Sequence, residues 1–178
     1  MTIDNDEALE LTAYHEAGHA VAMWKHELVI DQVSIEPDED EDANHSGMVE
    51  GKSPLSAYSL DAIINDEFSA IEKQKRVAVL VLLAGMAAEQ IYDLDLFKSV
   101  ARLYSGHYEY DLRSVQIIAR TLGYTDEKEK EWIQDRLDET KAMLKKEWDR
   151  VSALADTLLA KKTLPGVIAV NVIEKRSL

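Results

Sequence analysis

Two histidines and a glutamate near the N-terminus have the types and spacing that metal-dependent hydrolysis requires. They are His15, Glu16 and His19, in the run His-Glu-Ala-Gly-His. Residues i and i+4 of a helix are offset by about 40° and about 6 Å along its axis, so both imidazoles can bind one ion. Glu16 then lies beside the pair, where it can accept a proton from a water on the ion. Zinc lowers the pKa of such a water to about 7.

The residues around this motif are not those of an ordinary exposed helix. Gly18 lies inside it, and no charged residue follows His19 until Lys25. A glycine inside a helix lowers its stability by about 1 kcal/mol relative to alanine, and a solvent-exposed helix gains nothing in return. We therefore expect another backbone, or a substrate, to approach the helix closely at Gly18.

A zinc site needs a third protein ligand and an open position for water. The extended motif that supplies a third histidine in some metalloproteases is missing, because Ala22 and Lys25 occupy its two positions. His26 lies too far along the same helix to reach the same ion. The third ligand must come from elsewhere in the chain, and the candidates are Glu89, His107 and Asp111.

Composition limits the remaining possibilities. The chain has 178 residues, no cysteine and a formal net charge of −14. The missing cysteines leave histidines and carboxylates as the metal ligands, and the negative charge argues against nucleic-acid binding. The acidic N-terminus does not resemble a signal peptide, and the most apolar run, residues 77–88, is too short to cross a bilayer. We therefore expect a cytoplasmic protein with no membrane insertion.

Periodicity predicts a mainly α (α+β) fold with a small N-terminal β-sheet. Residues 7–26 have helical periodicity, whereas residues 28–36 are rich in β-branched side chains and end at Pro37. The strand is expected to return as a hairpin through residues 47–50. The acidic run 38–42 between them is predicted to be a solvated loop, since it lacks the spacing of its alternative, a calcium-binding loop.

The rest of the chain has the pattern of helices. The apolar middle of residues 67–92 predicts one long buried helix, and a further helix over residues 109–121 is closed by Gly123. Residues 126–161 predict a long amphipathic helix or a helical hairpin, which Pro165 ends. We expect a single domain over residues 1–178, with a metal-site core at about 8–125 and a C-terminal helical region at about 126–178.

Four motifs follow one another along the chain. The first is Thr-Ala-Tyr-His-Glu-Ala-Gly-His-Ala-Val at residues 12–21, and the second is Leu-Ala-Gly-Met-Ala-Ala-Glu at residues 83–89. The third is Ser-Gly at 105–106 with Asp-Leu at 111–112, and the fourth is the C-terminal segment 153–164. In this order the four motifs resemble the peptidase domain of the FtsH-type ATP-dependent zinc metalloproteases, in which the fourth is the closing helix. The resemblance covers about residues 8–175.

The resemblance implies a zinc site of His15, His19 and an aspartate, with Glu16 as the general base. The family aspartate falls on Asp111, although the spacing from Gly106 is one residue longer here, so His107 and Glu89 stay open as alternatives. Glu89 is expected to orient a ligand imidazole from behind. Its alternative is a buried ion pair with Arg102 or Arg120. Met86 stands where the family usually has arginine.

The function that the resemblance implies is a zinc-dependent endopeptidase, with one zinc ion per chain, acting on flexible or unfolded peptides. The strand at Gly47, Met48 and Val49 is the expected substrate platform, because an extended peptide can add to a sheet edge. The sequence contains no phosphate-binding loop and no membrane anchor, so we expect the peptidase unit to stand alone. Alternatives are a catalytically idle module that binds a partner or a separate ATPase, and a hydrolase of non-peptide amides. Homo-oligomerisation stays open.

Overall fold

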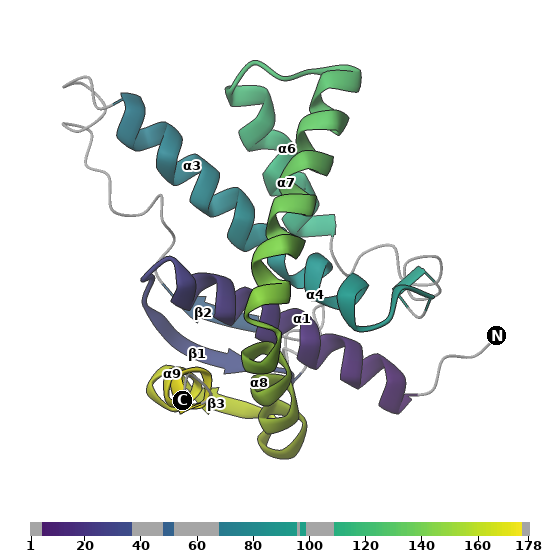
Figure 1. Cartoon of the computed structure of the whole chain (residues 1–178), viewed down its shortest axis with the longest axis vertical. Helices are drawn as coiled ribbons and strands as arrows, with labels where there is room; N and C mark the ends of the chain where they lie inside the picture. Colours follow the sequence, from purple (N-terminus) through teal and green to yellow (C-terminus); the bar gives the residue numbers. More distant parts are fainter. Residues whose placement is uncertain (1–4, 37–47, 52–67, 96, 99–108, 176–178) are drawn as a thin grey trace.

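The structure, a computed structural model, describes residues 5–36, 48–51, 68–95, 97–98 and 109–175. It is mainly helical with one small antiparallel sheet, as the sequence predicted (Figure 1). The elements in chain order are α1 (Asn5–Lys25), β1 (Ile30–Ser34), β2 (Met48–Gly51), α3 (Phe68–Leu82), α4 (Ala84–Tyr92), α6 (Glu109–Thr121), α7 (Asp126–Lys146), α8 (Trp148–Lys161), β3 (Thr163–Pro165) and α9 (Gly166–Lys175).

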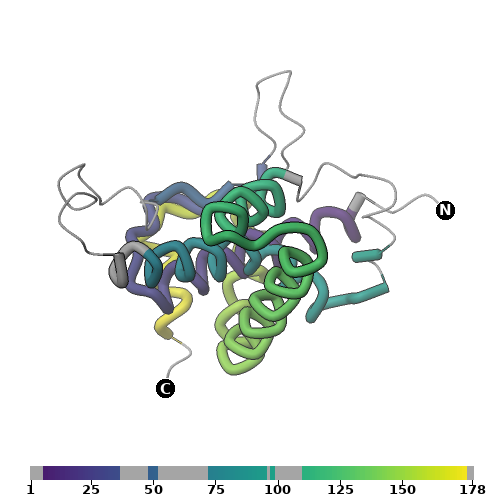
Figure 2. The backbone as a smooth tube through the Cα atoms, turned by 90° about the horizontal axis from the view of Figure 1, so that it is seen from above, coloured from purple at the N-terminus to yellow at the C-terminus, as the bar shows by residue number. Residues whose placement is uncertain are grey.

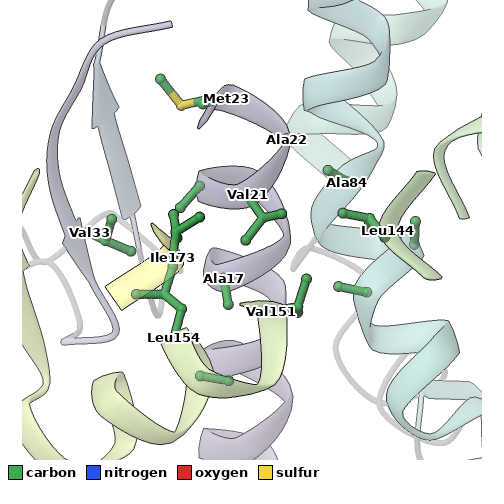
Figure 3. Packing of buried hydrophobic residues seen from close by; sticks show 14 of the residues in the cluster. Ala17, Val21, Ala22, Met23, Val33, Ala84, Leu144, Val151, Leu154 and Ile173 are labelled. Carbon is green, nitrogen blue, oxygen red and sulfur yellow. The ribbon is translucent and has the colours of Figure 1, made fainter. Parts of the chain in front are cut away.

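Helix α1 is the centre of the hydrophobic core. Its small apolar residues Ala13, Ala17, Ala20 and Val21 have no exposed surface, because α4, α8 and the sheet pack around it (Figure 3). A Cβ added at Gly18 would lie 2.5 Å from the carbonyl oxygen of Ala84, so the backbones of α1 and α4 approach each other directly. The predicted close approach at Gly18 is therefore confirmed.

The sheet has the order β2-β1-β3, with all pairs antiparallel. The predicted antiparallel pairing of β1 and β2 is present, with Val33 opposite Val49. Among the described residues, β2 pairs with β1 alone and is an edge strand. Strand β3 was not predicted. It brings the C-terminal segment against β1, where Leu164 pairs with Val33, and Figure 2 shows this yellow segment beside the blue strand.

The single helix predicted over residues 67–92 is in fact two helices, α3 and α4, that meet at Leu83. The carbonyl of Val81, which in a continuous helix would accept from the Gly85 N–H, accepts a hydrogen bond from Nδ1 of His19 at 2.8 Å. A side chain that takes part in the helical hydrogen-bond ladder is a known cause of such breaks. The interruption therefore lies where α1 meets α4.

The predicted helix over residues 126–161 also consists of two helices, which meet at Glu147. Helix α8 continues from the end of α7 and does not fold back as a hairpin (Figure 1). The Glu147 carboxylate contacts Lys25 at 2.6 Å and Arg150 at 2.7 Å, which ties this junction to the end of α1. Gly123, with φ of 86°, follows α6 as predicted.

Within the described ranges, no helix combines the length and apolarity needed to cross a membrane. The acidic run at 38–42, for which a solvated loop was predicted, lies outside the described residues.

Candidate metal centre

The middle of α1 carries His15, Glu16 and His19, and its two imidazoles face α3, α4 and the first turn of α6. His15 and Glu16 are buried, with 5% and 6% of their surface exposed, and His19 is partly buried. Helix α1 can hold such polar groups inside the core because small residues flank them, which allows α4 to pack closely on the same side. The motif thus lies in the interior and not on a solvated helix face.

The Nδ1 atom of each imidazole is held by a hydrogen bond to an oxygen atom of another helix. Nδ1 of His15 lies 3.0 Å from Oε1 of the fully buried Glu89, and Nδ1 of His19 lies 2.8 Å from the carbonyl oxygen of Val81. An ionised carboxylate and a carbonyl only accept hydrogen bonds, so both Nδ1 atoms must carry the proton. In the neutral rings, both Nε2 atoms then present lone pairs.

These two Nε2 atoms converge on one carboxylate oxygen. They lie 3.0 Å apart, and Oδ2 of Asp111 is 3.5 Å from that of His15 and 3.2 Å from that of His19. Ligand atoms at about 2.0–2.1 Å from a tetrahedral zinc ion lie about 3.3–3.4 Å from each other. The observed spacing brackets this value. His15, His19 and Asp111 therefore form a group that could hold a metal ion.

The pKa shifts of these three residues in the metal-free chain also favour the binding of a cation. Burial by itself would lower the pKa of His15, but the carboxylates of Glu89 and Asp111 outweigh it and raise this pKa well above its ordinary value. The pKa of His19 is likewise raised, because Asp111 outweighs the effect of burial. Burial would raise the pKa of Asp111, yet the two imidazoles hold it well below its usual range. The group therefore favours a positive charge at its centre.

Glu16 lies within electrostatic range of the same group without belonging to it. Burial raises its pKa, and the neighbouring His15 and His19 partly oppose this. A carboxylate with a raised pKa is better matched to taking up a proton near neutral pH than an ordinary surface glutamate.

The structure describes two of the three candidates for the third ligand, Asp111 and Glu89. Asp111 faces the Nε2 atoms, whereas Glu89 contacts the opposite edge of the His15 ring. Arg120, the suggested ion-pair partner of Glu89, pairs with Glu129 at 2.7 Å. The other suggested residues, His107 and Arg102, lie outside the described residues. Glu89 thus has the position expected of a group that orients an imidazole.

The proposed platform residues are described in part. Met48 and Val49 lie in the strand β2, and Met48 is exposed, whereas Gly47 lies outside the described residues.

Two features of the site were missed in the sequence. One is the carbonyl of Val81, which no side-chain pattern could have revealed. The other is an aromatic stack beside the site, in which Tyr14 lies 3.8 Å from Tyr92 and 5.5 Å from Trp148 between ring centroids. Tyr92 also donates to Glu10 at 2.5 Å, so the stack joins α4 and α8 to α1 next to His15. The adjacency of Tyr14 to His15 and of Tyr92 to Glu89 was the available signal.

The sequence matches no protein-family model and no curated protein.

Proposed function

We propose that this protein is a zinc-dependent endopeptidase that hydrolyses flexible or unfolded peptides. The observation that carries the proposal is the convergence of two histidine Nε2 atoms and one aspartate oxygen at tetrahedral spacing, with Glu16 buried beside them. The resemblance of its four motifs to the FtsH-type peptidase domains supports the same activity.

The donor set favours zinc over the other common metal ions. Two imidazole nitrogens and one carboxylate oxygen, with a position left for water, are typical of catalytic zinc sites. Magnesium and calcium prefer sites made of oxygen ligands alone. The orientation of His15 by Glu89 is the carboxylate–histidine arrangement that raises the basicity of a ligand imidazole.

The chemistry divides between the ion and Glu16. A zinc ion bound there would lower the pKa of a coordinated water to about 7 and polarise the scissile carbonyl. Glu16 takes the proton from the attacking water and returns it to the amine that leaves. Its raised pKa suits both steps, because the group must be able to hold the proton between them.

The position of β2 favours an extended peptide as the substrate. Among the described residues this strand forms one edge of the sheet, and Gly51 at its end approaches Met23 of α1, the helix that carries the motif. An extended chain can pair with a sheet edge through main-chain hydrogen bonds, irrespective of its side chains. If the substrate pairs with β2 in this way, N-methylation of its backbone near the scissile bond should abolish cleavage. Unchanged cleavage of all such N-methylated peptides would show that β2 does not bind the substrate backbone.

The substitution Glu16→Gln tests the proposed activity. Glutamine is nearly isosteric but cannot take up the proton, so cleavage of an unstructured peptide should fall by about 10²–10⁴-fold. Zinc content should not change, because both imidazoles and Asp111 are retained. The control is Glu7→Gln, an exposed glutamate on the same helix, which should cleave like the wild type.

The same experiment separates the enzyme from a catalytically idle module. An idle module would show no chelator-sensitive cleavage in the wild type, and its partner binding would not change in Glu16→Gln. Full cleavage by Glu16→Gln would exclude the mechanism proposed here, whatever the zinc content.

A further inference from the structure

Gly85 lies in the first turn of α4, directly against the two imidazoles. A Cβ added to it would lie 2.5 Å from Nε2 of His19 and 2.6 Å from Cδ2 of His15, and closer still to Nε2 of His15. Real Cβ atoms essentially never come within 3.0 Å of another atom in this way. The space in which the two Nε2 atoms meet is therefore open only because residue 85 has no side chain.

The imidazoles cannot easily withdraw from that space. The bond from Nδ1 of His15 to Glu89 and the bond from Nδ1 of His19 to Val81 hold both rings from behind. Rotation of either ring would break its bond and leave a buried polar group unsatisfied, which costs about 1–3 kcal/mol. A methyl group at position 85 would thus compete for space with whatever binds between the nitrogens.

The surroundings of Gly85 differ from those of Gly18, the glycine of the His-Glu-Ala-Gly-His motif. Gly18 approaches the backbone and Cβ of α4, which makes it a packing residue. At Gly85, by contrast, the three nearest atoms are all imidazole atoms of His15 and His19. The missing side chain therefore makes room for the two imidazoles and not for the backbone of α1.

The missing methyl group would overlap the space that an ion on the two Nε2 atoms needs. It would lie at or slightly below 2.5 Å from both atoms, and zinc–nitrogen bonds are about 2.0–2.1 Å long, so the methyl group and an ion could not both be present. We propose that Gly85 determines metal binding by exclusion: its lack of a side chain keeps open the space that the ion takes. The inference rests on the proposed function, because it requires a metal ion between these histidines.

The test is the variant Gly85→Ala. Gly123→Ala is the control for lost stability away from the site, since no atom lies near its missing Cβ but its φ of 86° makes alanine strained. Zinc is titrated into metal-free protein against a chromophoric chelator. Gly85→Ala should weaken zinc binding by more than about 100-fold, beyond the 10–100-fold typical for loss of a group behind a ligand. Gly123→Ala should bind zinc as the wild type does. Metal-free Gly85→Ala should unfold at a lower temperature than the wild type, because the methyl group fits only if a ring gives up its Nδ1 hydrogen bond, at a cost of about 1–3 kcal/mol.

If Gly85→Ala fails to fold, the triple variant Gly85→Ala/His15→Ala/His19→Ala decides the question, with His15→Ala/His19→Ala as its control. Truncating both rings removes all three atoms nearest to the methyl group, so the metal-free triple variant should fold as its control does. A triple variant that fails to fold while its control folds would assign Gly85 to the fold and overturn the proposal. Equal zinc affinity in Gly85→Ala and the wild type would overturn it as well, while the proposed function would stand. A wild type that binds no zinc would refute both.

Discussion

The two imidazoles of the site are fixed by acceptors of different kinds. Glu89 places a buried carboxylate behind His15, whereas His19 is held by the carbonyl oxygen of Val81. The carboxylate can stabilise positive charge on its imidazole, and the carbonyl mainly sets the ring orientation. Residue-scale experiments should therefore distinguish a group that binds the ion from a group that orients a ligand.

Asp111→Ala should weaken zinc binding far more than Glu89→Ala. Asp111 faces both Nε2 atoms, so its loss removes a ligand, whereas loss of Glu89 removes a contact behind His15 and should cost about 10–100-fold in affinity. Zinc titration of the metal-free variants measures both effects. The opposite ranking would move the third ligand to α4.

Zinc affinity should rise with pH. The raised pKa values of His15 and His19 mean that the metal-free site holds protons near neutral pH, and zinc must displace them. Each displaced proton should weaken apparent binding by about tenfold per pH unit below the raised pKa. Zinc titrations over about pH 5.5–8 measure this slope, and a flat profile over the range would contradict it.

The metal-free protein should show the opposite trend in stability. A histidine with a raised pKa stabilises the fold at low pH, and this contribution is lost as pH rises through the raised value. Stabilisation by added zinc should therefore be largest on the alkaline side of that range. His26→Ala, which removes a histidine with a lowered pKa outside the site, should leave the zinc profile unchanged.

At the scale of elements, the boundaries that the sequence did not predict are those created by tertiary contacts. The helical pattern of the sequence over residues 67–92 is unbroken. The interruption at Leu83 occurs beside the hydrogen bond that His19, distant in sequence, donates to the Val81 carbonyl. Strand β3 has only three residues and no alternation to reveal it, and it exists as a strand because β1 pairs with it. Helix α1 and the β1–β2 hairpin were predictable because their own periodicity encodes them.

Gly18→Ala tests the contact between α1 and α4. Alanine would favour the isolated helix by about 1 kcal/mol, but here its Cβ would meet the backbone of Ala84, and overpacking of this kind typically costs about 1–3 kcal/mol. The free energy of unfolding of the metal-free protein should therefore fall. Urea titration measures it, and a stabilised variant would show that the two backbones are not in contact.

At the scale of the whole molecule, the fold brings together residues from three separate helices. His15 and His19 come from α1, Glu89 from α4 and Asp111 from α6. The sequence predicted this set because the motifs occur in an order that resembles a known peptidase family. Spacing alone left Asp111, Glu89 and His107 open, since it does not specify which ring edge a distant carboxylate contacts. Only the packing of α4 and α6 on α1 separates Asp111 from Glu89.

The central claim is that His15, His19 and Asp111 together bind one zinc ion. Crystals grown with zinc and measured on both sides of the zinc absorption edge would test it most directly. We predict one strong anomalous peak per chain, bonded to Nε2 of both histidines at about 2.0–2.1 Å and to a carboxylate oxygen of Asp111. The absence of a peak between these residues, or a peak bonded to Glu89 in place of Asp111, would contradict the account.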